Sequence, residues 1–452
     1  MTGIENLLYF IVALGILVTF HEFGHFWVAR KLGVKVLTFS VGFGKPIWKR
    51  KGKDGVDYII AMIPLGGYVK MLDERDPDQK VSEKDKAYAF NQKSVWSRIA
   101  IVAAGPLANF ILAIGLYWWM FMVGITGLST GMGNIDPESV VGRAGLVKAD
   151  KIVSIDGQPV TFMSDITKAV AVRIGDKNIL ELEVVSEGNS HSKSIRVDLA
   201  DWQVDTEQMD LLDSMGFRHK IDDLVVLPKL YRVESGSPAD LGGLKAQDLI
   251  VQFEEHQVNS WQRLVELIES NAKNKIDLLI ERNGELNNIS VVIGTRQDDE
   301  SKGYLGAEPI RPARDEYFAV KKESVLSSFN LALNETSKMI ALSAGLFKKL
   351  ITGDISPKSL SGPISIAKGA GDTGRAGLVY FLSFLALISV NLGFINLLPV
   401  PLLDGGHLLY FSYEAVTGKP LSEKVQELGM QIGMLIVFAL MAMAIMNDIS
   451  RL

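Results

Sequence analysis

The sequence predicts a polytopic α-helical membrane protein with about four transmembrane helices, a membrane-associated β-hairpin and two tandem α+β domains outside the membrane. Three observations lead to this fold class. Four stretches are apolar for long enough to cross a bilayer. A pattern in the middle of the chain occurs twice without gaps. A short segment after the first apolar stretch is rich in β-branched and aromatic residues, as strands are.

The four apolar stretches are the expected spans. The first begins near the N-terminus, but no basic region precedes it and no small-residue cleavage site ends it, so we interpret it as a span and not as a signal peptide. The third runs into a segment that prolines break. The spans are Ile4 to Ala29, about Ile99 to Val123, about Leu378 to Leu398 and about Met430 to Met446.

These spans divide the chain into nine segments. They are residues 1–29 (first transmembrane helix), 30–96 (cytoplasmic loop with the β-hairpin), 97–123 (second transmembrane helix), 124–220 and 221–310 (the tandem domains), 311–376 (linker with an amphipathic helix), 377–410 (third transmembrane helix with the proline break), 411–427 (cytoplasmic loop) and 428–452 (fourth transmembrane helix and C-terminus).

Composition excludes several classes of protein and site. The formal net charge of -5 gives no dominant basic field, so we expect no nucleic-acid partner. The chain has no cysteine, which excludes a disulfide framework, a thiolate metal site and a cysteine nucleophile. Any metal ligands must therefore come from His, Asp and Glu.

The charge of the loop after the first span predicts the orientation of the chain. Lys and Arg exceed Asp and Glu there, and four of them lie close together at Lys49, Arg50, Lys51 and Lys53. By the positive-inside rule this loop is cytoplasmic. The tandem domains then lie on the outer side, and the segment around 404–424 returns to the cytoplasmic side.

Within that loop, residues 58–71 look like a β-hairpin. Residues typical of strands lie on each side of Pro64 to Gly67. Because the segment follows the first span closely, we expect a strand that dips toward the membrane.

The internal repeat predicts two domains of one kind. Ala144 to Val160 aligns on Gly242 to Val258, and in each copy a short strand is followed by a turn and a helix. The pattern resembles the PDZ domain of bacterial proteases. The linker stretch Ser324 to Leu350 is amphipathic, and we expect it to lie on a membrane surface. The alternative is a helix packed on the outer domains.

His21-Glu22-Phe23-Gly24-His25 is an H-E-x-x-H motif inside the first span. On a helix, residues four apart share one face, so both imidazoles can bind one metal ion. Glu22 is then placed to take a proton from water as a general base. Ionisable residues inside a span cost at least ~2.5–3.5 kcal/mol each on insertion scales, so three within one helical turn indicate function. We predict one catalytic Zn²⁺.

A third ligand is expected, because catalytic zinc sites usually have three protein ligands. His191, His219 and His256 lie in the outer region, on the wrong side of the membrane. Asp404 and His407 remain, in a segment whose prolines must interrupt the helix. The residues favour Asp404 and leave His407 as the alternative.

Together these motifs resemble the site-2 protease family of intramembrane zinc metalloproteases. The resemblance covers essentially the whole length in the same order, including Gly66 to Met71, Ala104 to Asn109 and Ser361 to Ile364. It implies that Asp404 is the third ligand. It also implies substrate-binding roles for Asn396, Pro399, Pro401, Gly66 and Gly67.

The resemblance further implies a place and partners. The protein is expected in a bacterial inner membrane, with the PDZ domains in the periplasm and the active site toward the cytoplasmic side. Its partners would be the lipid bilayer, single-pass transmembrane substrates such as an anti-sigma factor, and remnant signal peptides. A strand edge in the hairpin segment would hold the unwound substrate by β-addition.

Two other functions fit part of the pattern. A transporter or channel also places ionisable residues inside spans, and zinc-dependent peptide products would distinguish the two. A catalytically idle scaffold would use its PDZ domains to bind C-termini, but His21, Glu22 and His25 are all present. For the PDZ pair itself we expect a size filter over the active site, with capture of substrate C-termini as the rival role.

Overall fold

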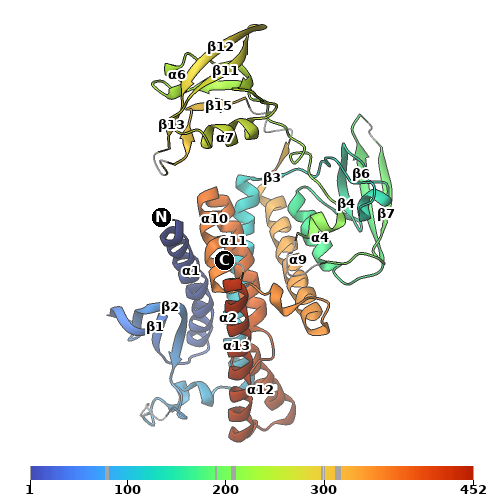
Figure 1. Ribbon diagram of the computed structural model, residues 1–452. Coiled ribbons are helices and arrows are strands. Elements are labelled where there is room, and N and C mark those ends of the chain that lie inside the picture. Colours follow the sequence, from blue (N-terminus) through green and yellow to red (C-terminus); the bar gives the residue numbers. More distant parts are fainter. Residues whose placement is uncertain are drawn as a thin grey trace.

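The computed structural model describes residues 2–76, 81–188, 191–204, 210–296, 299, 301–310 and 317–450. Within these ranges four helices are long and apolar enough to cross a membrane, as predicted. Figure 1 shows them as a bundle with one β-rich module beyond one end and another beside it, next to the helix of residues 325–352. The four are α1 (Thr2–Lys31), α2 (Val95–Val123), α11 (Leu378–Asn396) and α13 (Glu423–Ser450).

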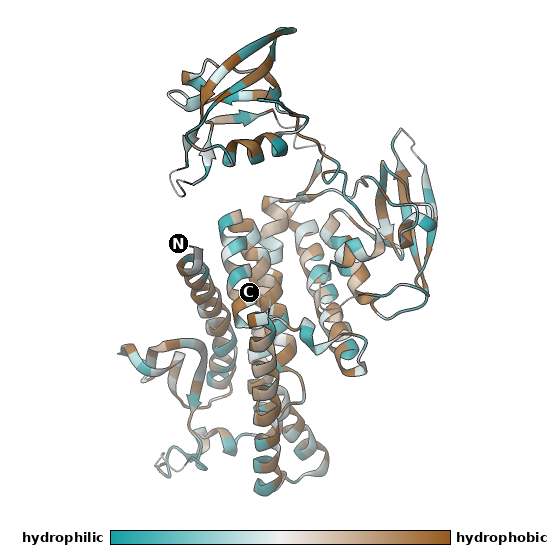
Figure 2. Cartoon of the chain, viewed as in Figure 1, coloured by the Kyte–Doolittle hydropathy of each residue, from teal (hydrophilic) through white to brown (hydrophobic). Residues whose placement is uncertain are grey.

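Helix α2 lies at the centre of the bundle and packs against α1 and α11. Apolar side chains join the helices in two clusters: Ala13 and Leu17 of α1 meet Phe381 and Leu385, and Ala113 of α2 meets Val390. The shorter helix α10 (Pro363–Ala376) packs along the start of α1. Figure 2 shows the apolar residues gathered on the long helices, whereas both β-rich modules are mixed.

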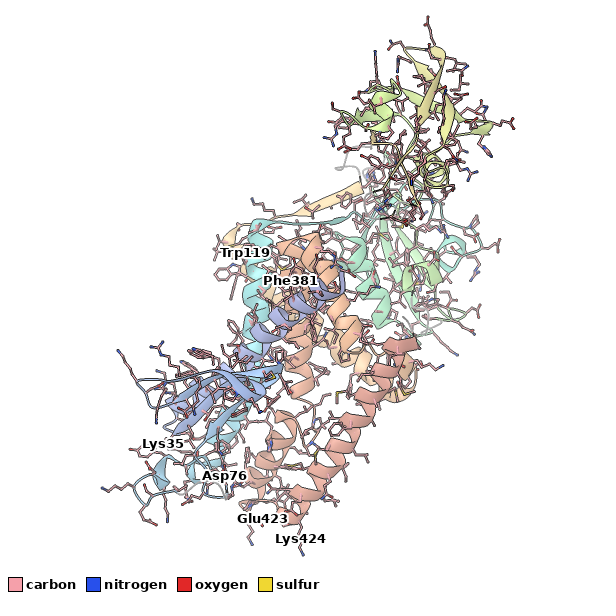
Figure 3. The ribbon with its side chains drawn as sticks, turned by 60° about the vertical axis from the view of Figure 1, so that its left-hand side comes forward. Lys35, Asp76, Trp119, Phe381, Glu423 and Lys424 are labelled. Carbon is pink, nitrogen blue, oxygen red and sulfur yellow. The ribbon has the colours of Figure 1, made fainter. Side chains whose placement is uncertain are left out.

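The ends of the bundle differ in character. Figure 3 shows Lys35, Asp76, Glu423 and Lys424 at one end and Trp119 at the other. The basic loop after α1 and the turn before α13 therefore share one side, as the sequence predicts.

The linker helix α9 (Val325–Thr352) does not lie as a separate surface helix. It packs lengthwise on the bundle, where Ala332 and Met339 are buried in the cluster with Ala113. Ser343 Oγ donates to Asn391 Oδ1 of α11 at 2.7 Å. The face with small residues thus covers other helices. Glu335 and Lys349 of α9 also pair with Lys168 and Asp176 of one β-rich module, so the alternative of a helix packed on the outer domains is confirmed in part.

Helix α13 stands apart from the other long helices and is held near its outer end. The Asp448 carboxylate accepts from the backbone N–H groups of Gly362, Ile364 and Ser365 at 2.8–3.1 Å, and so caps the start of α10. Asn447 Nδ2 donates to the backbone carbonyls of Pro357 and Leu360, in the turn that precedes α10.

The predicted β element is present, but its pairing differs from the prediction. Residues 57–71 form one long strand, β2 (Asp57–Met71), and its partner is β1 (Val36–Lys51), which the sequence analysis did not identify. Residues 38–41 pair on one side with 67–70 and on the other with 57–60, while 46–51 pair with 57–61. Four strand segments result, in the order 67–71, 36–41, 57–61, 46–51, so 67–71 is an edge.

The two outer modules share one architecture. Each has a four-stranded antiparallel sheet with one helix, and each buries its own apolar cluster. The backbone repeats in detail: Gly145 and Gly243 have φ of 95° and 85°, and Asp156 and Glu254 have φ of 48° and 50°. The first module contains β4 (Asp150–Ile155), β5 (Gln158–Pro159), β6 (Ile179–Ser186), β7 (Ser192–Asp198) and α4 (Met163–Val172); the second contains β9 (Leu249–Phe253), β10 (His256–Gln257), β11 (Lys275–Arg282), β12 (Glu285–Val292) and α7 (Trp261–Glu269).

Short elements complete the chain. Among the described residues, the remaining strands are β3 (Ile125–Leu128), β8 (Leu230–Val233), β13 (Gly294–Thr295), β14 (Gly303–Tyr304), β15 (Ala307–Pro309) and β16 (Phe318–Lys321), and the remaining α-helices are α3 (Val140–Arg143), α5 (Leu211–Met215), α6 (Pro238–Leu241) and α12 (Asp404–Thr417). β3 and β16 pair antiparallel, so the chain leaves α2 and returns toward α9 side by side. Both modules lie between these two strands in the sequence.

Candidate metal centre and active site

Helix α1 presents the H-E-x-x-H residues on one face. The apolar sequence on either side keeps the helix continuous from Thr2 to Lys31. His21 and His25 are one turn apart, their ring centroids are 5.0 Å apart, and their Nε2 atoms are 3.3 Å apart. Both lone pairs can therefore face one ion.

Asp404 joins the two histidines from the far end of the chain. Its Oδ2 lies 3.2 Å from His21 Nε2 and 3.4 Å from His25 Nε2. Ligand atoms of these three residues lie within 4.8 Å of one another. His407, the alternative from the sequence, lies one turn further along α12 and is not part of this group.

The three donors fit a tetrahedral zinc ion. Ligands about 2.0–2.1 Å from the metal in a tetrahedron are about 3.3–3.4 Å apart, and the three measured separations are 3.2, 3.3 and 3.4 Å. Asp404 Oδ2 is buried without a hydrogen bond of good geometry. Buried polar atoms are seldom left unpaired, so this arrangement suits a cation between the donors.

The other ring nitrogens are held by α2. His25 Nδ1 lies 2.9 Å from the Ile101 carbonyl, to which an Nδ1–H donates. His21 Nδ1 lies 3.1 Å from the side-chain amide of Asn109. The Ile101 carbonyl fixes the tautomer that leaves His25 Nε2 free for a metal. Asn109 does the same for His21 when its amide oxygen, and not its nitrogen, faces Nδ1.

Small residues let α1 and α2 approach closely enough for these contacts. A Cβ on Gly105 would overlap the His25 imidazole, and a Cβ on Gly24 would overlap the Ala104 carbonyl. Glycine at both positions is therefore a packing requirement, as at close helix crossings in membranes.

The proline-containing break between α11 and α12 places Asp404 beside the two histidines. Helix α11 ends at Asn396, residues 397–403 are not helical, and α12 begins at Asp404. Gly405 and Gly406 pack against the backbone of that break, where a Cβ would overlap the Leu398 carbonyl or Pro401. The Leu-Asp-Gly-Gly sequence thus allows the tight return that brings a carboxylate back to α1.

A cavity of about 490 Å³ opens beside the three donors. Glu22 and His407 line it, and so does the edge segment of β2. Gly67 of that edge lies close to Glu22, because a Cβ there would be 2.9 Å from Glu22 Cγ. The full lining is His21, Glu22, His25, Gly67, Tyr68, Val69, Lys70, Met71, Asp73, Asp76, Phe90, Ile101, Val102, Asp404, His407 and Phe411.

The predicted substrate-binding residues fall in different places. Gly67 lines the cavity, whereas Gly66 lies against the Phe43 ring. Asn396 is the last residue of α11, and Pro399 and Pro401 lie in the break before Asp404. None of the three is among the residues that line this cavity. Their roles toward a substrate stay predictions.

Asn109 is the site residue that sequence reasoning missed. It occurs in the stretch Ala104 to Asn109, to which no role was assigned, and it is fully buried. An amide near the middle of an apolar span is itself a signal, because burying it requires a polar partner.

Known proteins match this chain over nearly its whole length. Residues 9–440 match peptidase family M50. The regulator of sigma-E protease RseP from Escherichia coli strain K12 is 41% identical over 445 residues, which are 98% of this chain and 98% of that protein. The regulator of sigma E protease from Haemophilus influenzae is 40% identical over 447 residues, 98% of each. Among solved structures, the PDZ domain of an SdrC-like protein from Listeria innocua aligns with 19% of this chain and 97% of its own length, at 17% identity and a TM-score of 0.18.

Proposed function

This chain belongs to peptidase family M50, the site-2 protease family of zinc metalloproteases, and from that membership we propose that it cuts peptide bonds within transmembrane segments of other proteins. It is a multi-pass membrane protein with four candidate spans. The observation that carries the proposal is that three metal donors and a general base line a cavity beside an open strand edge.

We assign His21, His25 and Asp404 as the zinc ligands and Glu22 as the base. The three donor separations and the unpaired Asp404 Oδ2 support the ligand set. A bound zinc ion supplies Lewis-acid chemistry, which makes water more acidic and polarises a peptide carbonyl. Glu22 accepts the proton of the attacking water and returns it to the leaving amine.

The substrate must unwind before it can be cut. In a helix the amide and carbonyl of each peptide bond are engaged, and in a dry environment the freed groups need new partners. Residues 67–70 offer unpaired backbone groups along one side, because their other side is taken by 38–41. The substrate adds there as a further strand, which places its backbone beside Glu22.

Orientation and substrates follow from the sequence and the relatives. We place the basic end of the bundle in the cytoplasm and the PDZ domains in the periplasm of a bacterial inner membrane. The named activity of the Escherichia coli relative, regulation of sigma-E, supports an anti-sigma factor as one substrate of this chain. Remnant signal peptides form a second class, since they are also single apolar helices.

Cysteine cross-linking tests the strand-addition step. The chain has no cysteine, so single cysteines at Tyr68 or Lys70 can be introduced cleanly, in a Glu22→Gln background that holds substrate uncut. If substrate adds as a strand, the substrate position that cross-links best should shift by two residues between the two probes. Ile60→Cys, on an interior segment of the same sheet, is the matched control and should not cross-link. Identical substrate positions for both probes would contradict strand addition while leaving the metal assignment standing.

A further inference from the structure

The sheet formed by β1 and β2 is polar at one end and apolar at the other. Its basic end carries Lys49, Arg50, Lys51 and Lys53, all exposed. Its opposite end exposes large apolar side chains, with Ile47 and Met62 at 69% and 59% exposure. Figure 1 shows the sheet extending sideways from α1, away from the rest of the bundle, in keeping with the exposure of these side chains among the described residues.

Contacts with α1 fix the depth of each end. Asp54, in the turn at the basic end, accepts from Arg30 Nη1 at 2.5 Å. Gly67, toward the apolar end, lies against Val18 and Glu22. Arg30 and Val18 are twelve residues apart on the helix, so the sheet runs along about 18 Å of α1, from its last turn to the depth of the metal centre.

Aromatic residues mark where the membrane surface crosses this region. Trp27 of α1 is 53% exposed and has Lys31 over its ring at 5.8 Å. Trp and Lys side chains so placed are typical of a membrane interface. Arg50 lies opposite Tyr58, whose ring packs on Phe26 at 6.1 Å, so the basic end is level with that interface.

Most of the basic charge there is uncompensated within the described parts of the chain. Asp57 pairs with Lys49 at 3.0 Å, and Asp54 pairs with Arg30. The recorded ion pairs leave Arg50, Lys51 and Lys53 without a carboxylate. Three free cations at headgroup depth, above an exposed apolar surface, complement a leaflet rich in anionic lipid.

We propose that the basic end of this sheet binds the headgroups of anionic phospholipids, which sets the depth at which strand 67–71 stands beside the metal centre. The apolar end then lies among acyl chains, and the edge strand is held at the level of Glu22. The contact does not depend on the proteolytic reaction. Only its assignment to the cytoplasmic leaflet rests on the orientation proposed above.

Lipid-specific quenching tests this without proteolysis. A single Ile47→Cys, added to Glu22→Gln and labelled with a bimane dye, reports which acyl chains surround the sheet. The protein is reconstituted in mixed phosphatidylcholine and phosphatidylglycerol, with bromine on the chains of one lipid or the other at equal mole fraction. One basic residue at an anionic surface contributes about 1 kcal/mol, or about fivefold in local concentration. At low salt we expect brominated phosphatidylglycerol to be enriched around the probe by about fivefold or more.

Charge variants separate a local site from general attraction. Arg50→Gln/Lys51→Gln/Lys53→Gln should bring the enrichment close to one. Lys84→Gln/Lys419→Gln/Lys424→Gln removes the same charge from exposed positions elsewhere on that side and should leave the enrichment unchanged. Equal quenching by both lipids in the parent protein, or full enrichment in the first triple variant, would overturn the proposal. Zinc content of the Arg50/Lys51/Lys53 variant checks that the site remains intact.

Discussion

Nδ1 of His21 lies 3.1 Å from the side-chain amide of Asn109, and the amide oxygen of Asn109 has no partner among the described residues. An imidazole that gives its Nε2 lone pair to a metal carries its proton on Nδ1, and that proton needs an acceptor. Turning the amide by 180° puts Oδ1 opposite His21 Nδ1 and satisfies both groups. Asn109 is thus placed to orient one of the two histidines from a neighbouring helix.

Removing that amide should weaken metal binding. We expect Asn109→Leu to lower zinc affinity about 10–100-fold, as for other partners of metal-bound histidines, and Asn109→Asp to retain it. Competition with a chromogenic chelator measures this. Ser389→Ala, which removes only the hydrogen bond to the Asn109 carbonyl, is the control and should behave as the parent. Unchanged affinity in Asn109→Leu would exclude the positioning role.

Variants of the base Glu22 and of the proposed third ligand Asp404 should differ in how much zinc they bind. Glu22→Gln should abolish cleavage, by at least about 10²-fold, yet keep one zinc per chain, because Glu22 is outside the donor triangle. Asp404→Asn should lose metal as well as activity, since a neutral amide is a poorer ligand for Zn²⁺ than a carboxylate. Metal analysis of purified protein beside a cleavage assay distinguishes the two. Turnover by Glu22→Gln would refute the mechanism.

Accessibility of introduced cysteines tests the orientation. Lys51→Cys and Lys419→Cys lie toward the same end of the bundle, so both should resist an impermeant thiol reagent applied outside intact cells. Ser192→Cys, exposed on β7 of the first PDZ module, should react. The opposite labelling pattern would place the PDZ pair in the cytoplasm.

The pairing of β3 with β16 allows a precise deletion of both PDZ modules. Leu128 and Phe318 are directly opposite each other, so residues 129–317 can be replaced by an Asn-Gly turn that leaves both strands paired. If the modules act as a size filter, this variant should cleave substrates that still carry a folded outer domain. If they capture substrate C-termini, it should lose cleavage of trimmed substrates. A stable variant that cuts trimmed and rejects untrimmed substrate would rule out the filter.

The buried cap between α13 and α10 should matter for stability more than for chemistry. Asp448→Asn removes a charge that accepts three backbone N–H groups, and we expect a loss of about 2–4 kcal/mol in unfolding free energy. Asp372→Asn, an exposed carboxylate paired with Arg375 on α10, should cost less than about 1 kcal/mol. Thermal unfolding in detergent compares them. Equal losses would show that Asp448 is not the anchor.

Much of the fold and the core of the site could be predicted from the sequence. The spans, the repeat and the i, i+4 histidines are local patterns, so they can be interpreted from the sequence without knowledge of the tertiary fold. Elimination favoured Asp404 over His407, because few ionisable residues occur inside spans. In the structure Asp404, and not His407, lies within 4.8 Å of both histidines, which supports that assignment.

The remainder depends on contacts between distant segments. Strand β1 begins with a stretch typical of strands, Val36 to Phe43, which the sequence analysis overlooked. Gly42, Gly44, Pro46 and the basic run interrupt that pattern, and pairing with β2 reveals the full strand. Helix α9 was expected on the membrane surface because amphipathicity does not reveal which apolar surface a helix covers. The role of Asn109 requires knowing that α2 crosses α1 at Gly24.

Contacts with α2 hold both parts of the metal centre, the histidines of α1 and Asp404 of α12. Ile101 and Asn109 hold the two histidines of α1, and a buried ion pair from Arg98 to Glu414 at 2.6 Å ties α12, which begins with Asp404, to the same helix. If α1 swung away from α2, the histidines would leave while Asp404 stayed behind. If the protein cuts transmembrane helices as proposed, a lateral gate between α1 and α2 would therefore pull the metal donors apart, and the substrate helix would have to reach Glu22 by another route through the bundle.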